Sequence, residues 1–200
     1  MRRFFESDAE RAPFTWGVYD GATQACGIWR KSGVSLDAFE VGKKLETLLN
    51  QSGVPDNYGY AVSVDVIFDP EDFIQYLRNA YEIKRFRFTS HFENAHDVQR
   101  LIQKPAQEYA EIVGAEKTTV EAEGRNLDAE VLEDLTRSVA SIGEEATAVV
   151  KMEENSRSKR IVLRGTPFSV EVSLDSIGNF FEKSREAIVD AYRNLRRQQS

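Results

Sequence analysis

Residues 61–89 of the chain read AVSVDVIFDPEDFIQYLRNAYEIKRFRFT. The first eight alternate between apolar and polar side chains and are rich in β-branched residues, which predicts a strand over 61–68. Asp69 and Pro70 then favour a helix start, because Asp accepts hydrogen bonds from the first turn and proline fits there without losing one. A further apolar run predicts a strand over 83–89. This stretch therefore predicts a strand, a helix and a strand in close succession.

The same interleaving continues on both sides of this stretch. The other elements expected are strands at 15–19 and 25–31, a helix at 36–50, a helix interrupted at Pro105 across 98–113, a strand at 117–123, a helix at 127–142, strands at 146–152, 160–164 and 168–174, and a helix at 176–197. This order predicts an α+β fold: a mixed, mostly antiparallel sheet, interleaved helices packed on it, and a long C-terminal helix. We expect one domain over 1–200, with a loose arm at 1–12, and a small N-terminal lobe at 13–52 as an alternative division.

Local signals refine this plan. Ser35 and Asn126 stand where helices are expected to begin, and both residue types are good N-caps. The apolar phase slips between Ile83 and Phe86, which predicts a β-bulge or an edge strand.

Composition excludes several classes of protein. The chain has 200 residues and one cysteine, Cys26, so an internal disulfide framework and a cysteine-rich zinc site are both excluded. No apolar run approaches the roughly 20 residues that a transmembrane helix needs, so we expect no membrane partner. The first residues, MRRFFESD, lack the apolar segment of a signal peptide, so we expect a cytoplasmic protein.

The charge is uneven along the chain. The formal net charge is −7, but residues 105–154 hold thirteen acidic and four basic side chains, a net charge of −9. We expect the acidic side chains of this part to lie on exposed helix faces and ends: Glu108, Glu111, Glu130, Glu133, Asp134, Glu144 and Glu145. They serve solubility or, alternatively, form a docking surface for a basic partner.

Motifs of the common catalytic classes are missing. Cys26 lies in an expected strand with no histidine near it in sequence, and the glycines match neither the phosphate-loop nor the dinucleotide-binding template. We therefore expect no cofactor and incline toward a protein without catalysis of its own.

The two histidines form one weak metal candidate. His91, Glu93 and His96 fall within six residues, although the spacing of the histidines is not the four residues of a zinc-protease helix. A loop could bring all three onto one cation; alternatively, the segment caps the next helix.

A second candidate is Asp69, or alternatively Asp65, with Glu82 and Lys84. The residue types resemble the Asp…Glu-x-Lys pattern of restriction-type nucleases, in which the carboxylates hold Mg²⁺ and the lysine polarises water. Here, however, Asp69 opens a helix instead of ending a strand. An ion-paired exposed strand gives the same Glu-x-Lys pattern.

Two basic segments are candidates for nucleic-acid contact. Basic residues interleave with aromatics over 84–88, as in RNA-binding sheets, and others end the last helix, where they also suit the helix dipole. The candidate residues are Lys84, Arg85, Arg87, Arg193, Arg196 and Arg197.

The order of elements from Trp16 to the strand expected after Pro167 resembles a bacterial family of unknown function. The segments that carry the resemblance are IKRFRF at 83–88, KTTV at 117–120 and ATAV at 146–149. The resemblance implies no catalytic residues. It implies an association with mobile elements or antiviral defence.

The leading hypothesis is a non-catalytic interaction module that binds another protein, as a subunit or regulator of such a bacterial system. The alternative is a Mg²⁺-dependent nuclease or nucleic-acid-binding effector. A homo-oligomer paired through the C-terminal helix is a third hypothesis, because Phe180, Phe181, Ile188 and Leu195 form one apolar stripe there; alternatively, this stripe covers the sheet.

Overall fold

The computed structural model describes residues 14–31, 33, 37–91, 102–163, 165–172 and 179–197, without the side chain of Arg197. Its elements are β1 (Gly17–Asp20), β2 (Ala25–Ile28), α1 (Ala38–Gln51), the 3-10 turn η1 (Asp56–Tyr58), α2 (Glu71–Asn79), β3 (Glu82–His91), α3 (Gln103–Val113), β4 (Lys117–Glu123), α4 (Ala129–Ser141), β5 (Ala146–Lys151), β6 (Lys159–Val162) and α5 (Phe180–Arg197). The predicted α+β class and long C-terminal helix are confirmed. Among the described helices, none is long and apolar enough to cross a membrane.

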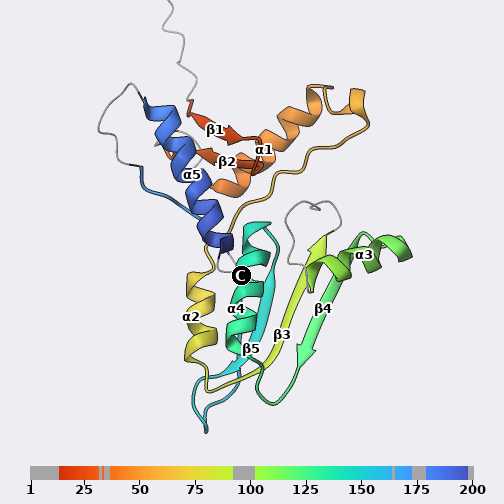
Figure 1. Cartoon of the computed structure of the whole chain (residues 1–200), viewed down its shortest axis with the longest axis vertical. Coiled ribbons are helices and arrows are strands. Elements are labelled where there is room, and N and C mark those ends of the chain that lie inside the picture. The colour runs from red at the N-terminus through yellow and green to blue at the C-terminus, as the bar shows by residue number, and fades with distance from the viewer. Residues whose placement is uncertain are drawn as a thin grey trace, which may run out of the picture.

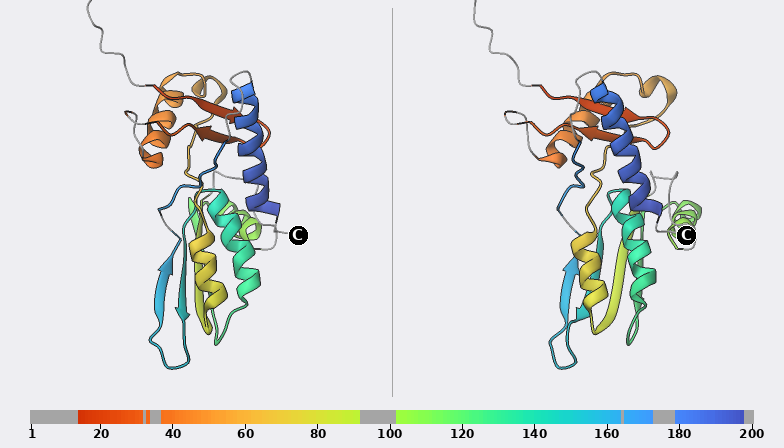
Figure 2. Two further views of the ribbon diagram at one scale, coloured as in Figure 1. Left: turned by 90° about the vertical axis from the view of Figure 1, so that its left-hand side faces the viewer. Right: turned by 60° about the vertical axis from the view of Figure 1, so that its left-hand side comes forward.

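The larger sheet has four antiparallel strands in the order β4-β3-β5-β6. Because β4 and β5 both run antiparallel to the central β3, they are parallel to each other. The chain crosses from one to the other through α4, which lies with α2 over one face of the sheet (Figures 1 and 2). The second sheet is the β1–β2 hairpin, which lies with α1 and part of α5 beyond one end of the larger sheet.

The main core lies between the larger sheet and the helices α2 and α4. Phe86 and Phe88 of β3 are 2% and 1% exposed and pack with side chains of both helices. The other core members include Phe73, Leu77, Leu132, Leu135, Val139, Ala148, Val150 and Ile161. Burying each large apolar side chain contributes about 1.5–3 kcal/mol, so this layer is the main source of stability.

The opposite face of β3 is polar. Arg85 and Arg87 alternate with the buried Phe86 and Phe88, so their side chains point away from the core. The predicted irregularity is confirmed as a register shift between Ile83 and Arg85 in the pairing with β5.

An ion-pair network joins α2 to α4. Arg137 is 5% exposed and donates to Glu71 at 2.6 Å and to Glu133 at 3.1 Å. Glu133 also accepts from Arg78 of α2. A buried guanidinium needs such partners, because an unpaired one costs several kcal/mol.

The hairpin packs on α5. Asp20 is 3% exposed, and its side chain accepts from the backbone and hydroxyl of Thr23 and from the Arg185 guanidinium of α5. Gly27 faces Ile188 so closely that a Cβ built on Gly27 would lie 2.1 Å from the Ile188 Cδ1. Leu195 of α5 is 4% exposed, and the helix also contacts α4.

The strand predicted over 61–68 is wrong. This segment is extended but forms only one isolated bridge, between Phe68 and Pro167. Side chains of α1 take the backbone bonds that a strand would use: Asn50 exchanges two hydrogen bonds of 2.8 Å with Val62, and Glu46 accepts from Val64. Residues 168–172 likewise form no strand.

The predicted caps also need correction. Asn126 does not cap α4; its Oδ1 accepts from the Ile83 backbone N–H at 2.9 Å, and Asp128 is the cap. Asp37 caps α1, while the predicted cap Ser35 lies outside the described residues. The predicted helix residues 98–101, the arm at 1–12 and residues 173–178 before α5 also lie outside the described residues.

Candidate functional site

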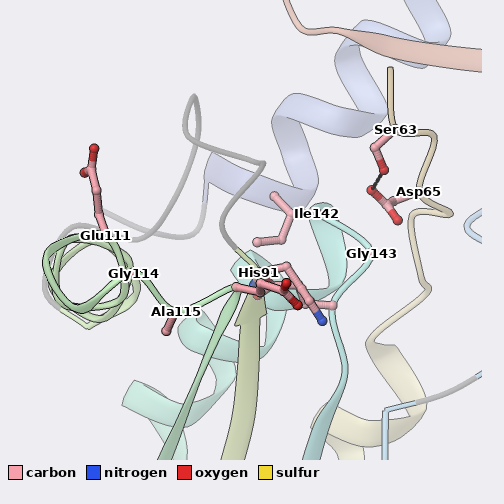
Figure 3. Close-up of a pocket in the computed structure, with 10 residues that line it drawn as sticks. Ser63, Asp65, His91, Glu111, Gly114, Ala115, Ile142 and Gly143 are labelled. Atoms are coloured by element: carbon pink, nitrogen blue, oxygen red, sulfur yellow. Dashed lines mark hydrogen bonds between the residues drawn. The ribbon is translucent and has the colours of Figure 1, made fainter. Parts of the chain in front are cut away.

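A pocket of about 700 Å³ lies at the end of the larger sheet where β3 ends. Its wall comes from separate parts of the chain: Ser63, Asp65, His91, Glu111, Gly114, Ala115, Glu116, Ile142, Gly143 and Glu144. Figure 3 shows Asp65, bonded to Ser63, on one side, Glu111 of α3 on the other, and His91 with Ile142 and Gly143 between them. The wall therefore includes four acidic residues and one histidine around a space large enough for a small molecule.

Glu144 owes its position to the end of α4. The Glu144 N–H bonds to the Val139 carbonyl and the Gly143 N–H to the Ala140 carbonyl, which is the Schellman pattern. Gly143 takes the required left-handed conformation, with φ of 72°. The residue after such a glycine usually makes an apolar contact with the helix. Here that position holds a carboxylate that is only 4% exposed.

Burial raises the pKa of the Glu144 carboxyl to about 7, and the nearby Asp65 carboxylate adds to the shift. Hydrogen bonding from the His91 backbone and the Ser90 and Gln103 side chains opposes it. The His91 N–H donates to the Glu144 Oε1 at 2.6 Å. A group that titrates near neutral pH inside a pocket marks a functional-site candidate.

Of the three residues of the metal candidate, only His91 lies within the described residues. His91 ends β3 and lines the pocket, whereas Glu93 and His96 lie outside the described residues. Within the described ranges, no three His, Cys, Asp or Glu side chains are grouped so that they could hold a metal ion.

The structure keeps Asp69 apart from Glu82 and Lys84. Asp69 precedes α2 and accepts from the Glu71 N–H, whereas Glu82 follows the other end of that helix. The nine residues of α2 span about 13 Å. Lys84 lies 3.6 Å from the Glu82 carboxylate, so these two form the exposed ion pair that the sequence left as the alternative.

The basic residues of β3 face acidic residues of β4. Arg85 pairs with Glu123 at 3.0 Å and with Glu121 at 3.6 Å, and Arg87 stands directly opposite Glu121 in the sheet. Their charge is therefore compensated on the same face. A phosphate backbone gains less from such side chains than from unpaired ones.

The basic residues of α5 lie elsewhere. This helix contacts α4, which covers the inner face of the sheet, whereas Arg85 and Arg87 point outward. Arg193 is exposed, Arg196 bonds to the Tyr192 hydroxyl at 3.0 Å, and the Arg197 side chain is not described. The two basic segments thus do not form one surface.

A second prominent feature is a group of exposed aromatic rings beside the hairpin, called here the aromatic cluster. Its members are Phe14, Trp16, Trp29, Phe180 and Phe181. Neighbouring rings meet edge to face with centroids 5.1–5.7 Å apart, and they join both flanks of the hairpin to the start of α5. Phe14, Trp16 and Phe181 remain 58%, 52% and 51% exposed.

Sequence reasoning missed both features. The sequence places Phe180 and Phe181 on one apolar stripe with Ile188 and Leu195; in the structure Ile188 and Leu195 pack inward, whereas Phe181 is exposed beside the hairpin. Glu144 was expected on the surface, and that expectation is wrong because α3, the end of β3 and residues 63–65 surround it. The one local signal is Gly143 followed by a glutamate where an apolar residue is usual.

Comparisons with protein-family models, curated proteins and solved structures find no match to this chain. The resemblance to a bacterial family linked to mobile elements or defence therefore stays a prediction from the sequence.

Proposed function

We propose that this protein is a non-catalytic interaction module that docks another protein on the aromatic cluster. The observation that carries the proposal is the contiguous set of large aromatic rings that the fold leaves exposed. Aromatic side chains are enriched in protein interfaces, and tryptophan and tyrosine lead among the residues whose loss weakens binding most.

The edge-to-face contacts explain why such a surface can bind well. Each ring of the cluster is held by a neighbouring ring, so its orientation is set before a partner arrives. Because little side-chain entropy is lost on binding, more of the apolar burial appears as affinity.

The rim of the cluster indicates the chemistry of the partner. The Lys31 ammonium lies 4.4 Å from the centre of the Phe14 ring, and Arg30 is exposed beside Trp29. A partner segment with a bulky apolar side chain next to an acidic one fits this surface, since the apolar group covers the rings and the acid meets the rim.

The test is a pull-down from cells of the source organism, with and without nuclease treatment. Wild-type protein is compared with Trp16→Ser/Phe181→Ser. The control is Tyr58→Ser/Tyr60→Ser, which removes two aromatics that are 73% and 72% exposed but outside the cluster. Far-UV circular dichroism checks that each variant folds.

We expect a stoichiometric protein that survives nuclease, is retained by the control variant, and is lost from the cluster variant by about 30-fold or more, which corresponds to about 2 kcal/mol. Equal capture by all three proteins would refute the proposed surface. Capture of nucleic acid alone would favour the nucleic-acid alternative.

A further inference from the structure

The charged side chains that line the pocket beside Glu144 are mainly acidic. Its wall includes the carboxylates of Asp65, Glu111, Glu116 and Glu144, with no lysine or arginine among its described lining residues. The nearest basic position in the sheet is Lys117, directly opposite His91 in the pairing of β3 with β4. Such a pocket attracts a cation, because a nearby carboxylate disfavours the ionised form of its neighbour, as Asp65 does for Glu144, and a positive charge relieves this repulsion.

The hydrogen bonding of Glu144 also indicates a ligand, independently of the acidic composition of the wall. The carboxyl accepts from the His91 N–H through Oε1 and is also hydrogen-bonded by the Ser90 and Gln103 side chains, but its Oε2 is buried and has no donor at normal hydrogen-bond geometry among the described residues. A buried carboxylate oxygen left without a donor costs about 1–3 kcal/mol or more. Such a group in a native protein calls for an explanation, and a ligand that donates to it from the pocket is one that also accounts for the acidic wall.

We propose that this pocket binds an organic cation, whose ammonium or guanidinium group pairs with the Glu144 carboxylate. Both groups donate several hydrogen bonds and carry the charge that the wall lacks. The Ile142 side chain and the Ala115 methyl group lie in the same wall and suit the aliphatic stem of such a molecule.

The wall suits an organic cation better than a metal ion. Metal binding needs three or more ligands converging at about 2.0–2.6 Å, and no described set of side chains is so placed. A guanidinium or ammonium group is larger and accepts carboxylates several ångströms apart. The source of the cation is either a free small molecule or a basic side chain of a bound protein.

Binding should depend on pH, because only ionised Glu144 pairs with the cation. The titratable groups that line the pocket with Glu144 are His91 at the end of β3, Asp65 from the segment before α2, and Glu111 and Glu116 from α3 and the residues after it; of these, Asp65 acts directly on Glu144.

The experiment follows amide chemical shifts by NMR at about 0.15 M salt, where weak surface ion pairs are screened. The first probe is 1,4-diaminobutane, with 1,4-butanediol as its neutral isostere. A second arm uses a short peptide with one central lysine, whose termini are blocked. A third arm uses MgCl₂.

The variants separate the pocket from general acidity. Glu144→Gln keeps the oxygen that accepts from His91 and removes the charge. Asp65→Asn changes an exposed member of the wall, which avoids disturbing the core. Glu130→Gln is the matched control, since it removes an exposed acid at the other end of α4.

We expect saturable shifts at Gly114 and Gly143 with the diamine or the lysine peptide and none with the diol. The dissociation constant should rise about tenfold or more in Glu144→Gln, a few-fold in Asp65→Asn, and not at all in Glu130→Gln. Preference for the diamine or for the peptide identifies the source of the cation.

Four results would each overturn the proposal: the diol binds as tightly as the diamine, Glu144→Gln binds as tightly as wild type, only Mg²⁺ causes shifts, or no shift is saturable. Since the aromatic cluster is untouched, none of these results bears on the docking proposal.

Discussion

Asp20 shows how one side chain can hold two elements together. Hydrogen bonds from the Thr23 backbone N–H, the Arg185 guanidinium and the Thr23 hydroxyl lower the pKa of its carboxyl from 3.8 to about 2. The ionised form is therefore favoured in the folded state. This contribution is complete above about pH 4 and is lost as the pH falls through about 2.

Replacement of Asp20 by Asn should consequently lower the melting temperature at neutral pH and flatten its decline below pH 4. Thermal unfolding followed by circular dichroism between pH 2 and pH 7 measures both. Asp190→Asn, an exposed change on α5, is the control. A parallel decline in Asp20→Asn and wild type would contradict this role.

Glu144 should act on stability in the opposite sense. Its pKa in the folded state is about 7, above the ordinary value of 4.5, so between these values the folded protein holds a proton that the unfolded chain has lost. The free energy of unfolding should therefore fall as the pH rises from about 4.5 to about 7. Glu144→Gln should remove this fall and be more stable than wild type above pH 7, by about 3 kcal/mol.

Urea titrations at pH 4.5, 6 and 8 test this difference. Glu130→Gln again serves as the control, since its side chain is exposed. A difference between Glu144→Gln and wild type that is the same at all three pH values would show that ionised Glu144 is not destabilising.

At the scale of elements, the fit of α5 on β2 depends on Gly27. A Cβ on Gly27 would lie 2.1 Å from the Ile188 Cδ1 and 2.7 Å from its Cγ1, so Gly27→Ala should cost about 1–3 kcal/mol. The same change should cost less when Ile188→Ala has already opened the space. Gly17→Ala in β1 is the matched control, because the nearest atom to its Cβ would be 3.7 Å away.

A double-mutant cycle by urea unfolding measures the coupling, which we expect to be about 1 kcal/mol or more. If the costs of Gly27→Ala and Ile188→Ala were simply additive, the helix would not rest on Gly27 as described.

The elements also show what the sequence could predict. The strand over 117–123 was predicted at its observed bounds, and the helix that became α1 within two residues, because both have strong local periodicity. The segment 61–68 has equally strong alternation but loses its strand to side chains of α1. Such competition depends on contacts distant in sequence, so a local pattern cannot reveal it.

At the scale of the whole molecule, stability is unevenly distributed. The main core draws all its members from residues between Val66 and Leu163, whereas few apolar side chains of the hairpin and α5, such as Ala25 and Leu195, are fully buried. Regions with few buried apolar contacts open locally before the protein unfolds.

Hydrogen exchange followed by mass spectrometry should therefore find β1 and β2 exchanging about 100-fold faster than β3 and β5. Peptides covering 17–28 and 82–91 give the comparison directly. Equal protection of the two sheets would show that the hairpin and the larger sheet unfold as one unit.

Both candidate sites are formed by residues far apart in the sequence. Local sequence patterns therefore did not predict them. The aromatic cluster joins residues at both flanks of the hairpin to Phe180 and Phe181, more than 150 positions later. The pocket joins residues 63–65, the end of β3, the end of α3 and Glu144. Apart from the glutamate that follows Gly143, neither site has a local sequence pattern, because each forms only when distant elements pack together.

The most direct test of the proposed function is site-specific photo-crosslinking in cells of the source organism. A benzophenone side chain replaces Phe14 within the cluster or, as the control, Tyr58, which is 73% exposed outside it. Docking on the cluster predicts one discrete protein adduct from position 14 that is absent from position 58 and is competed by untagged wild type but not by Trp16→Ser/Phe181→Ser. The same adducts from both positions, or none from position 14, would contradict it.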